Sequence, residues 1–518
     1  MSLILGLNTF HGDASACLIR DGELLAAAEE ERFRRIKHWA GFPSQAIAYC
    51  LAHAQVELDQ IDHIAQNSDP RAHWPRKLAY ALTRRPSLGL LRDRLRNRQQ
   101  RASLPALFAE HFPQQIVRAQ WHTIEHHYAH LASAFLVSPF KEAVVVSVDG
   151  FGDFASAAWG IGQGNTLRLD GHVYFPHSLG MFYQALTQYL GFPNYGDEYK
   201  VMGFAPYGQP RYVEPLRQLL QLLSDGTFRL NMKYFRHGRE SVPYRWDNGS
   251  PAVGTLYTPA LEQLLGPARQ RDEPLQARHQ DMACSIQAVY EEAFFHLLRT
   301  LHRRYATDAV ALAGGCAMNS VANGKITLQT PFKQVYVQAA AGDAGGALGA
   351  AYAVAQRLEM PARCYVEHAY WGPDADASAI AALLAAQQPA LQAAGCHWIQ
   401  LPEADLLEHT AQALVQGKVV GWFQGRMEWG PRALGARSIL ADPRRADMKD
   451  ILNHKIKRRE SFRPFAPAIL REAVKDWFDL DLPVPFMSQV FPVRPEKRAL
   501  ISRRINSVAQ VSSAGGSP

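Results

Sequence analysis

The chain has 518 residues and a formal net charge of +7, and 47% of its residues are hydrophobic while 20% are charged. This composition is typical of a globular protein with a large buried core, and the length predicts two to four domains. The sequence has no run of about 18 apolar residues, which excludes an ordinary membrane-spanning helix. The N-terminus lacks a basic segment followed by a small-residue cleavage site, so we expect a cytoplasmic protein.

Much of the positive charge lies in residues 71–101, which contain ten Lys or Arg residues and one acid, Asp93. Basic runs bind nucleic-acid backbones in some proteins. Aromatic residues do not interleave with these arginines as they do in proteins that bind single strands. We therefore interpret the run as a solvated helical insertion, and nucleic acid is not expected as a partner.

Hydrophobic periodicity and turn residues predict two copies of one hairpin-rich plan before residue 170. The first copy comprises a strand, a polar turn and two further strands, at residues 3–8, 9–13, 15–19 and 23–28. The second copy has the same elements in the same order, at residues 143–148, 149–153, 155–161 and 166–169. We therefore expect a duplicated α/β core with a cleft between its halves.

Two further predicted strands lead into glycine-rich junctions. Residues 309–313 run into Gly314 and Gly315, and residues 334–338 run into a segment that contains Gly342. Glycine-rich turns present backbone N–H groups and allow a phosphate to approach closely. Together with the turns of the two hairpin copies, these junctions suit a nucleotide. The residues that we assign to nucleotide or adenylate binding are Gly314, Gly315, Asn319, Asn323 and Gly342.

The segment at residues 125–130 is predicted to be helical and carries a pair of histidines. His126 and His130 are four residues apart, so they lie on one helical face and can bind one metal ion. Asp343, at the mouth of a glycine-rich turn, is available as a third ligand. Two imidazoles and one carboxylate suit a divalent cation such as Fe²⁺, Mn²⁺ or Zn²⁺. Asp149 could hold a ribose, a phosphate-bound cation or an acceptor hydroxyl group.

Proline and acidic residues interrupt the periodicity at residues 361–377, where we place a domain boundary. The expected N-terminal domain covers residues 1–360, and a second domain covers residues 374–498. Residues 426–463 contain eleven Lys or Arg residues and five acids, alternating with aromatic residues and prolines. Arginine forks and lysine ammonium groups bind phosphate oxygens, so we expect an anion-binding site in this segment.

These motifs together resemble the O-carbamoyltransferases of antibiotic and nodulation-factor biosynthesis, the NodU/CmcH family. The resemblance covers most of the chain up to residue 495. The matching stretches are residues 6–16, 27–33, 125–130, 199–208, 314–325, 342–345, 430–438 and 457–467. So many long motifs in one order are specific for this family.

The resemblance implies two lobes with different chemistry. The first is a duplicated lobe of the actin/sugar-kinase type (ASKHA), similar to the subunit that transfers a threonylcarbamoyl group in tRNA modification. The second is a smaller α/β lobe of the YrdC type, in which carbamoyl phosphate and ATP, with Mg²⁺, give carbamoyladenylate and pyrophosphate. The first lobe then transfers the carbamoyl group to a hydroxyl group of a small-molecule acceptor, a secondary metabolite or a sugar, and AMP leaves.

The resemblance also implies roles for individual residues. Those that resemble metal ligands, with Fe²⁺ as the expected metal and Mn²⁺ or Zn²⁺ as alternatives, are His126, His130 and Asp343. Those that resemble contacts of carbamoyl phosphate and ATP are Arg432, Lys457 and Arg463. The residues that we assign to catalysis are His11, Asp149 and Lys200. A homodimer is compatible with the sequence.

Three other functions are compatible with parts of the pattern. The duplicated core is shared by sugar and acetate kinases, which lack the histidine pair and the basic C-terminal lobe. A threonylcarbamoyl transferase that acts on tRNA would use the basic run. A non-catalytic binding module would bind the acceptor without a nucleotide.

The resemblance stops near residue 498. Residues 499–518 are polar and small and lack the period of a strand or a helix, so we expect a disordered tail. The second lobe would then be incomplete, with an open sheet edge and a half-lined anion pocket. We therefore expect this chain to form carbamoyladenylate poorly.

Overall fold

The computed structural model describes residues 2–84, 104–246 and 249–498. The expected tail at residues 499–518 and most of the basic run lie outside these ranges. The first part of that run forms helix α3 (Trp74–Arg84), as the sequence predicts. Among the described residues, no helix combines the length and the apolar character needed to cross a membrane.

The first sheet contains five strands in the order β3-β2-β1-β4-β5. These strands are β1 (Leu3–Asn8), β2 (Ser15–Arg20), β3 (Glu23–Glu29), β4 (His63–Gln66) and β5 (Gln120–Thr123). The first three pair antiparallel, whereas β1, β4 and β5 run parallel. All six residues of β1 are buried, because helices cover both faces of this sheet.

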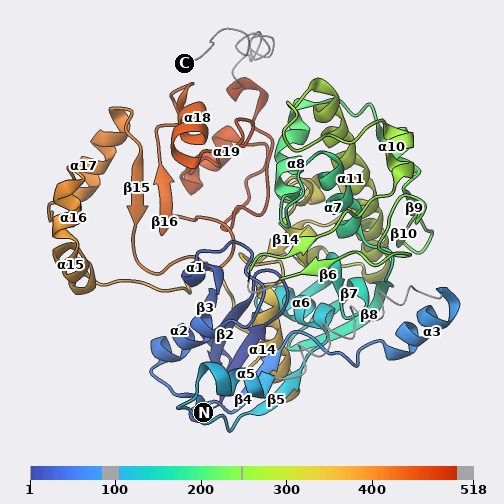
Figure 1. The fold of residues 1–518 in the computed structure, drawn as a ribbon, viewed down its shortest axis with the longest axis horizontal. Coiled ribbons are helices and arrows are strands. Elements are labelled where there is room, and N and C mark those ends of the chain that lie inside the picture. Colours follow the sequence, from blue (N-terminus) through green and yellow to red (C-terminus); the bar gives the residue numbers. More distant parts are fainter. Residues whose placement is uncertain (1, 85–103, 247–248, 499–518) are drawn as a thin grey trace.

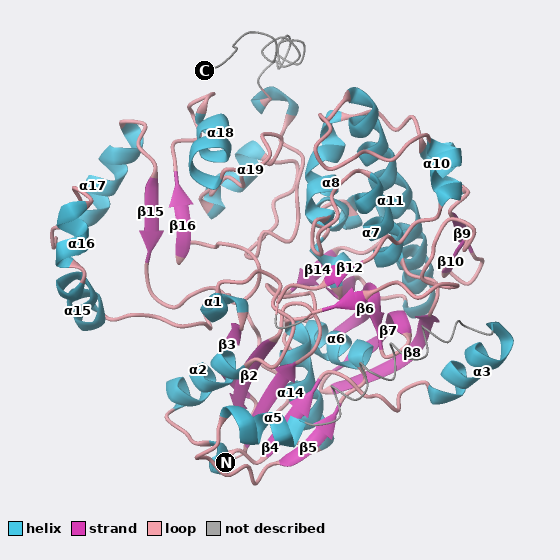
Figure 2. Ribbon diagram, viewed as in Figure 1, coloured by secondary structure: helices cyan, strands magenta, loops and turns pink. Residues whose placement is uncertain are grey.

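The second sheet repeats this plan in the order β8-β7-β6-β13-β14. Its strands are β6 (Glu142–Gly152), β7 (Ala155–Gln163), β8 (Thr166–Tyr174), β13 (Ala309–Ala313) and β14 (Gln334–Val337). Three strands are again antiparallel, and the last two are again parallel to the first. The two sheets, whose strands are magenta in Figure 2, therefore share one topology, and the predicted duplication is confirmed.

The expected turn at residues 149–153 is shorter than predicted. Strand β6 continues through Gly152, with a register shift against β7 between Val148 and Gly152. The chain reverses at Asp153 and Phe154, which both have positive φ angles. The irregular pairing permits this extension, because a bulge bends a strand without ending it.

Two helices lie between the sheets, α6 (His126–Phe135) against the second and α14 (Gly345–Arg357) against the first. Glycines make this layer thin. A Cβ atom on Gly349 would lie 1.7 Å from the carbonyl oxygen of Ala129, and one on Gly6 would lie 2.1 Å from that of Ala347. The backbones therefore approach closely, and residues that precede either helix are brought together at one end of the layer.

Other helices cover the outer faces. The first sheet is covered by α2 (Ser44–Ala54), and the second packs in a larger core with α7 (Leu179–Tyr189), α8 (Glu198–Phe204) and α11 (Ala277–Tyr305). The shorter helices are α1 (Glu31–Arg34), α5 (Leu104–His111), α9 (Val213–Arg217), α10 (Pro259–Leu265), α12 (Ser320–Asn323) and α13 (Ile326–Gln329). The short strands are β9 (Leu220–Leu222), β10 (Phe228–Leu230), β11 (Tyr244–Arg245) and β12 (Ala252–Val253).

The C-terminal part forms a separate region (Figure 1), in which few of the described residues are buried. Its elements are α15 (Ala377–Ala386), α16 (Gln388–Ala393), α17 (Glu403–Val415), β15 (Val420–Phe423), β16 (Arg437–Leu440), α18 (Met448–Ile451) and α19 (Val474–Trp477). Strands β15 and β16 pair antiparallel, and none of the first three helices has a buried residue.

The C-terminal part contacts the N-terminal part through buried polar pairs. The N–H group of Gly430 donates to Glu29 at 2.6 Å, and the Arg426 guanidinium donates to the carbonyl oxygen of Leu25 at 3.1 Å. Trp429, between these contacts, is completely buried. These contacts attach the basic segment of the C-terminal part to the first sheet.

Candidate metal centre and anion site

Helix α6 brings the two predicted histidine ligands together. Glu125 is its N-cap and accepts a hydrogen bond from the N–H group of Tyr128 at 2.6 Å, which satisfies one free donor of the first turn. His126 and His130 lie one turn apart on the buried face, and both side chains are almost fully buried. Their Nε2 atoms lie 3.1 Å apart.

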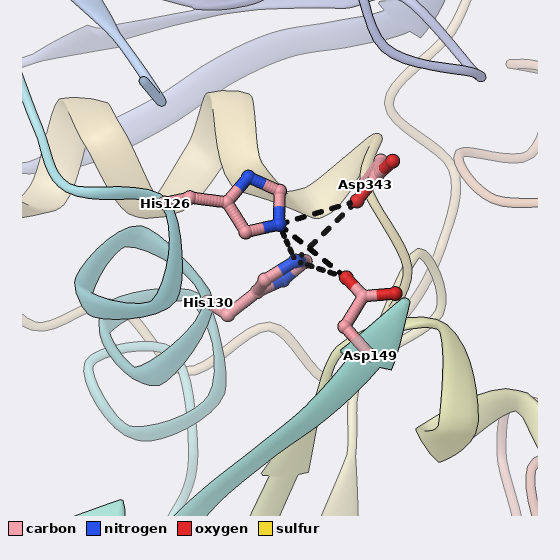
Figure 3. A group of neighbouring side chains, drawn as sticks. All are labelled: His126, His130, Asp149 and Asp343. Carbon is pink, nitrogen blue, oxygen red and sulfur yellow. Dashed lines mark hydrogen bonds and ion pairs between the residues drawn. The ribbon is translucent and has the colours of Figure 1, made fainter. Parts of the chain in front are cut away.

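Two carboxylates complete this cluster (Figure 3). Asp149 Oδ2 lies 3.0 Å from His130 Nε2 and 3.4 Å from His126 Nε2. Asp343 Oδ1 lies 3.4 Å from His130 Nε2 and 3.6 Å from His126 Nε2. Asp149 comes from strand β6, and Asp343 comes from the turn that precedes α14. The expected convergence of the histidines with Asp343 is therefore present, and Asp149 is a fourth candidate ligand.

The four donors fit a divalent transition-metal cation. Bonds of about 2.0–2.2 Å to imidazole and carboxylate place neighbouring ligand atoms about 3.0–3.5 Å apart, which agrees with the distances above. Asp343 Oδ1 is buried and has no hydrogen-bond partner among the described residues. Two imidazoles and two carboxylates that all point at one position are the expected surroundings of such a cation.

The electrostatics of the cluster also favour a cation. Although burial opposes its protonation, the hydrogen bond with Asp149 and the nearby carboxylate of Asp343 raise the pKa of His130 to about 9. Burial and the nearby charge of Asp149 raise the pKa of Asp343, while the two histidines hold the pKa of Asp149 well below its usual range, against burial. Two carboxylates this close require positive charge between them, which either protons or a metal ion can supply.

Glycines allow the backbone to approach the cluster. A Cβ atom on Gly152 would lie 2.0 Å from the His126 ring, and one on Gly315 would lie 2.9 Å from Asp149 Oδ1. A Cβ atom on Gly180 would lie 2.7 Å from the backbone of Asp149. Two of the glycine-rich turns predicted from the sequence, at Gly152 and Gly315, therefore lie against the candidate metal ligands.

His11 lies next to this cluster. Its side chain is buried, and its ring centroid lies 5.1 Å from that of His126 in an edge-to-face arrangement. A neighbouring pair was missed by sequence reasoning: His38 Nδ1 lies 2.8 Å from Asp13 Oδ1. The sequence motif that contains His11 also contains Asp13, but nothing in the sequence indicates that His38 folds back onto it.

The residues assigned to nucleotide binding divide into glycines that lie near the cluster ligands and asparagines whose side chains bond within the protein. Gly315 and Gly342 flank the cluster ligands, and a Cβ atom on Gly342 would meet no atom closer than 4.0 Å. Gly314 has a φ of 88°, which favours glycine. The two asparagines bond within the protein: Asn319 caps α12 and pairs with Gln287, and Asn323 donates to the carbonyl oxygens of Ala317 and Ser488.

The predicted anion-binding residues form a cationic cluster in the C-terminal part. Burial and the neighbouring Arg463 lower the pKa of Arg432. Burial together with Arg459 and Arg463 lowers the pKa of Lys457. The Arg463 guanidinium lies 4.0 Å from the ring centroid of Tyr199, on α8 of the N-terminal part. Cations that repel one another in this way attract a bound anion, and Arg459, which lies inside the predicted basic segment, is a further member of the cluster.

Lys200 joins the two parts of the chain. Its Nζ atom lies 2.9 Å from Asp197 Oδ1 on the N-terminal side and 3.0 Å from Glu460 Oε1 on the C-terminal side. These carboxylates raise the pKa of Lys200 against the effect of burial. The ammonium group therefore stays charged and bonds across the lobe boundary.

Comparisons with known proteins identify the family. Residues 3–352 match the family model described as carbamoyltransferase N-terminus, and residues 411–512 match the one described as carbamoyltransferase C-terminus. The chain belongs to the carbamoyltransferase family, as its motifs indicate, and it is a carbamoyltransferase. The four candidate metal ligands lie within the first match, and the cationic cluster of Arg432, Lys457 and Arg463 lies within the second.

Three curated proteins are similar to this chain over most of its length. The uncharacterized protein sll1178 of Synechocystis is 41% identical, over 96% of this chain and 80% of the relative. The nodulation protein NolNO of Sinorhizobium fredii is 36% identical, over 95% of this chain and 68% of the relative. The nodulation protein NolO of Bradyrhizobium diazoefficiens is 39% identical, over 72% of this chain and 64% of the relative.

Similarity to solved structures is weaker. The crystal structure of HypF from T. kodakarensis aligns with 69% of this chain and 48% of its own, at 15% identity and a TM-score of 0.33. This similarity is too low to support a conclusion about the chain.

Proposed function

We propose that this carbamoyltransferase uses ATP and carbamoyl phosphate to form carbamoyladenylate, and that it transfers the carbamoyl group to a hydroxyl group of a small-molecule acceptor. The observation that carries the proposal is the presence of two sites with different chemistry. One is the buried cluster of two histidines and two aspartates, and the other is the cationic cluster of the C-terminal part.

The cationic cluster suits the first step. Carbamoyl phosphate loses orthophosphate to water, and the resulting carbamate oxygen attacks the α-phosphorus of ATP and displaces pyrophosphate. Arg432, Lys457 and Arg463 hold the phosphates of both substrates, and ATP carries Mg²⁺. A bound anion removes the mutual repulsion of these cations and is stabilised by charge-assisted hydrogen bonds.

The C-terminal part is proposed as a lobe of the YrdC type, over residues 374–498. Its antiparallel pair of β15 and β16 and its basic loops support this assignment. Residues 1–360 are the proposed transferase lobe, of the actin/sugar-kinase type, because both of its five-stranded sheets share one strand order. The division assigns adenylation and transfer to different lobes.

The buried cluster suits the second step. The cation, which we propose to be Fe²⁺ with Mn²⁺ or Zn²⁺ as alternatives, would be held by His126, His130, Asp149 and Asp343 and would polarise the carbamoyl carbonyl group. The nearby glycine-rich turns hold the AMP phosphate through backbone N–H groups. His11 takes the proton of the acceptor hydroxyl group as its oxygen attacks the carbonyl carbon, and AMP leaves.

The products of the reaction test this proposal. With ATP, carbamoyl phosphate and a hydroxylated acceptor, the purified chain should release pyrophosphate and AMP and form an acceptor heavier by one carbamoyl group, as measured by mass spectrometry. The first of these products is expected to form slowly, in line with the poor carbamoyladenylate formation expected from the sequence. Release of ADP with phosphorylation of the acceptor would instead establish a kinase. Products that form only on tRNA would establish a threonylcarbamoyl-type transferase.

A further inference from the structure

A second group of metal-binding side chains lies outside the centre described above. His73, Glu125 and His172 each offer one ligand atom, and these three atoms lie within 4.8 Å of one another. His73 precedes helix α3, Glu125 is the N-cap of α6, and His172 belongs to strand β8. Three segments that are distant in the sequence therefore converge here on a set of imidazole and carboxylate donors.

The candidate ligand atoms of these side chains make no hydrogen bond within the described residues. His73 Nε2, Glu125 Oε1 and His172 Nε2 are each buried and have no hydrogen-bond partner among the described residues. The distance between His73 Nε2 and Glu125 Oε1 is 3.5 Å, which is too long for a hydrogen bond and close to the spacing of two ligands of one metal ion. Buried polar atoms are normally satisfied, so three unsatisfied atoms that face one another indicate a missing cation.

Neighbouring groups fix these side chains in orientations that leave the ligand atoms available. Glu125 binds the N–H group of Tyr128 through Oε2, which leaves Oε1 for a metal ion. His172 stacks on the ring of Tyr174, with 5.3 Å between the ring centroids, and its Nε2 atom is the one that has no hydrogen-bond partner among the described residues. Such partners commonly orient the ligands of a metal.

The backbone at His73 supplies independent support. Its φ angle is 56°, in the left-handed region that residues other than glycine seldom adopt. Strained backbone of this kind persists where the surroundings require a particular side-chain position. Here the conformation directs the imidazole ring to within 4.7 Å of the ring of His172, measured between centroids.

We propose that His73, Glu125 and His172 form a second site for a divalent transition-metal cation, with Zn²⁺ as the probe. Two imidazoles and one carboxylate are a known ligand set for Zn²⁺, and water fills the remaining position. The cation fastens α3 to strand β8 and to the first turn of α6. Arg76 and Tyr80 of α3 already contact Tyr174 and Phe175, so the helix is in place for this attachment.

Metal stoichiometry tests the proposal. The full chain, freed of metal with a chelator, is loaded with Zn²⁺, desalted and measured by elemental analysis. The wild-type protein should retain two equivalents, and His73→Ala and His172→Ala should each retain one. His409→Ala, which removes an exposed histidine of α17, should retain two. His130→Ala should lose the equivalent at the other centre, so the two sites are counted separately.

Proteolysis supplies a second measurement that does not depend on activity. At a free Zn²⁺ concentration of about 100 times Kd, the open population of α3 and its tryptic cleavage after Arg76 or Lys77 should fall about 100-fold in the wild-type protein. The same Zn²⁺ should give no protection in His172→Ala, provided that its thermal midpoint without metal equals that of the wild-type protein. Equal zinc content in the wild-type protein, His73→Ala and His172→Ala, or equal protection in all three, would overturn the proposal.

Discussion

The carboxylate of Asp153 accepts a hydrogen bond from the backbone N–H group of His126 at 2.9 Å. The same carboxylate accepts hydrogen bonds from Ser68 Oγ at 3.0 Å and from the N–H group of Asp69 at 2.7 Å. The turn after β6 is thereby connected both to the segment after β4 and to the first residue of the helix that carries the metal ligands. Asp153 is a positioning residue for the metal centre.

Replacing Asp153 should weaken metal binding without removing a ligand. In Asp153→Asn the amide cannot accept all three hydrogen bonds, so the start of α6 loosens, and we expect metal affinity to fall by about tenfold or more. Metal affinity is measured by competition with a chelator. Asp308→Asn, which changes an exposed carboxylate paired with Lys333, is the matched control and should bind metal normally. An unchanged affinity in Asp153→Asn would show that the connection does not position the ligands.

Loss of a metal ligand should separate the two proposed steps. His130→Ala leaves the other three ligands in place but removes the one nearest to Asp149. We expect this variant to lose bound metal and carbamoylation of the acceptor, whereas pyrophosphate release that depends on carbamoyl phosphate persists. Elemental analysis and the two product assays measure this. A variant that keeps its metal would contradict the assignment of His130.

The cationic cluster should be required only for the first step. Arg432→Ala and Lys457→Ala each remove a charge-assisted contact of about 1.5–3 kcal/mol, so pyrophosphate release should fall by at least tenfold. Preformed carbamoyladenylate should restore transfer in both variants. Arg444→Ala, which removes an arginine paired with Asp442, is the control. If carbamoyladenylate does not restore transfer in folded variants, adenylation and carbamoyl transfer do not take place at separate sites as proposed.

Glu29 lies at the contact between the two parts of the chain, and its raised pKa should make the free energy of unfolding depend on pH. Burial raises its pKa to about 7, against the charge of Arg32. In the unfolded chain the pKa is about 4.3, so the folded state binds the proton more tightly. The contribution of this group to stability is therefore fully present below the pKa of the unfolded chain, about 4.3, and is lost as the pH rises through about 7.

A substitution isolates this effect. Across this range the free energy of unfolding of the wild-type protein should fall relative to that of Glu29→Gln, by roughly 4 kcal/mol at about 1.4 kcal/mol per pKa unit. Denaturant unfolding of both proteins at several pH values measures the difference. The same dependence in both proteins would show that Glu29 is not the responsible group.

Local sequence patterns determined the elements and several site residues. Short apolar runs bounded by turn signals place the hairpins of both copies, because strand and turn formation depends on neighbouring residues. The four-residue separation of His126 and His130 places them on one helical face for the same reason. The basic segment that contains Arg432 and Arg463 also follows from composition alone.

Tertiary packing decided which of these elements meet. Asp149 joins the histidines because β6 continues past the expected turn and glycines such as Gly152 let the backbones approach. Lys200 bonds to Glu460 across 260 positions of sequence, and His73 meets His172 across 99 positions. Sequence periodicity reports only on neighbouring residues. These distant residues meet because two sheets and two helices are buried together in one layered core.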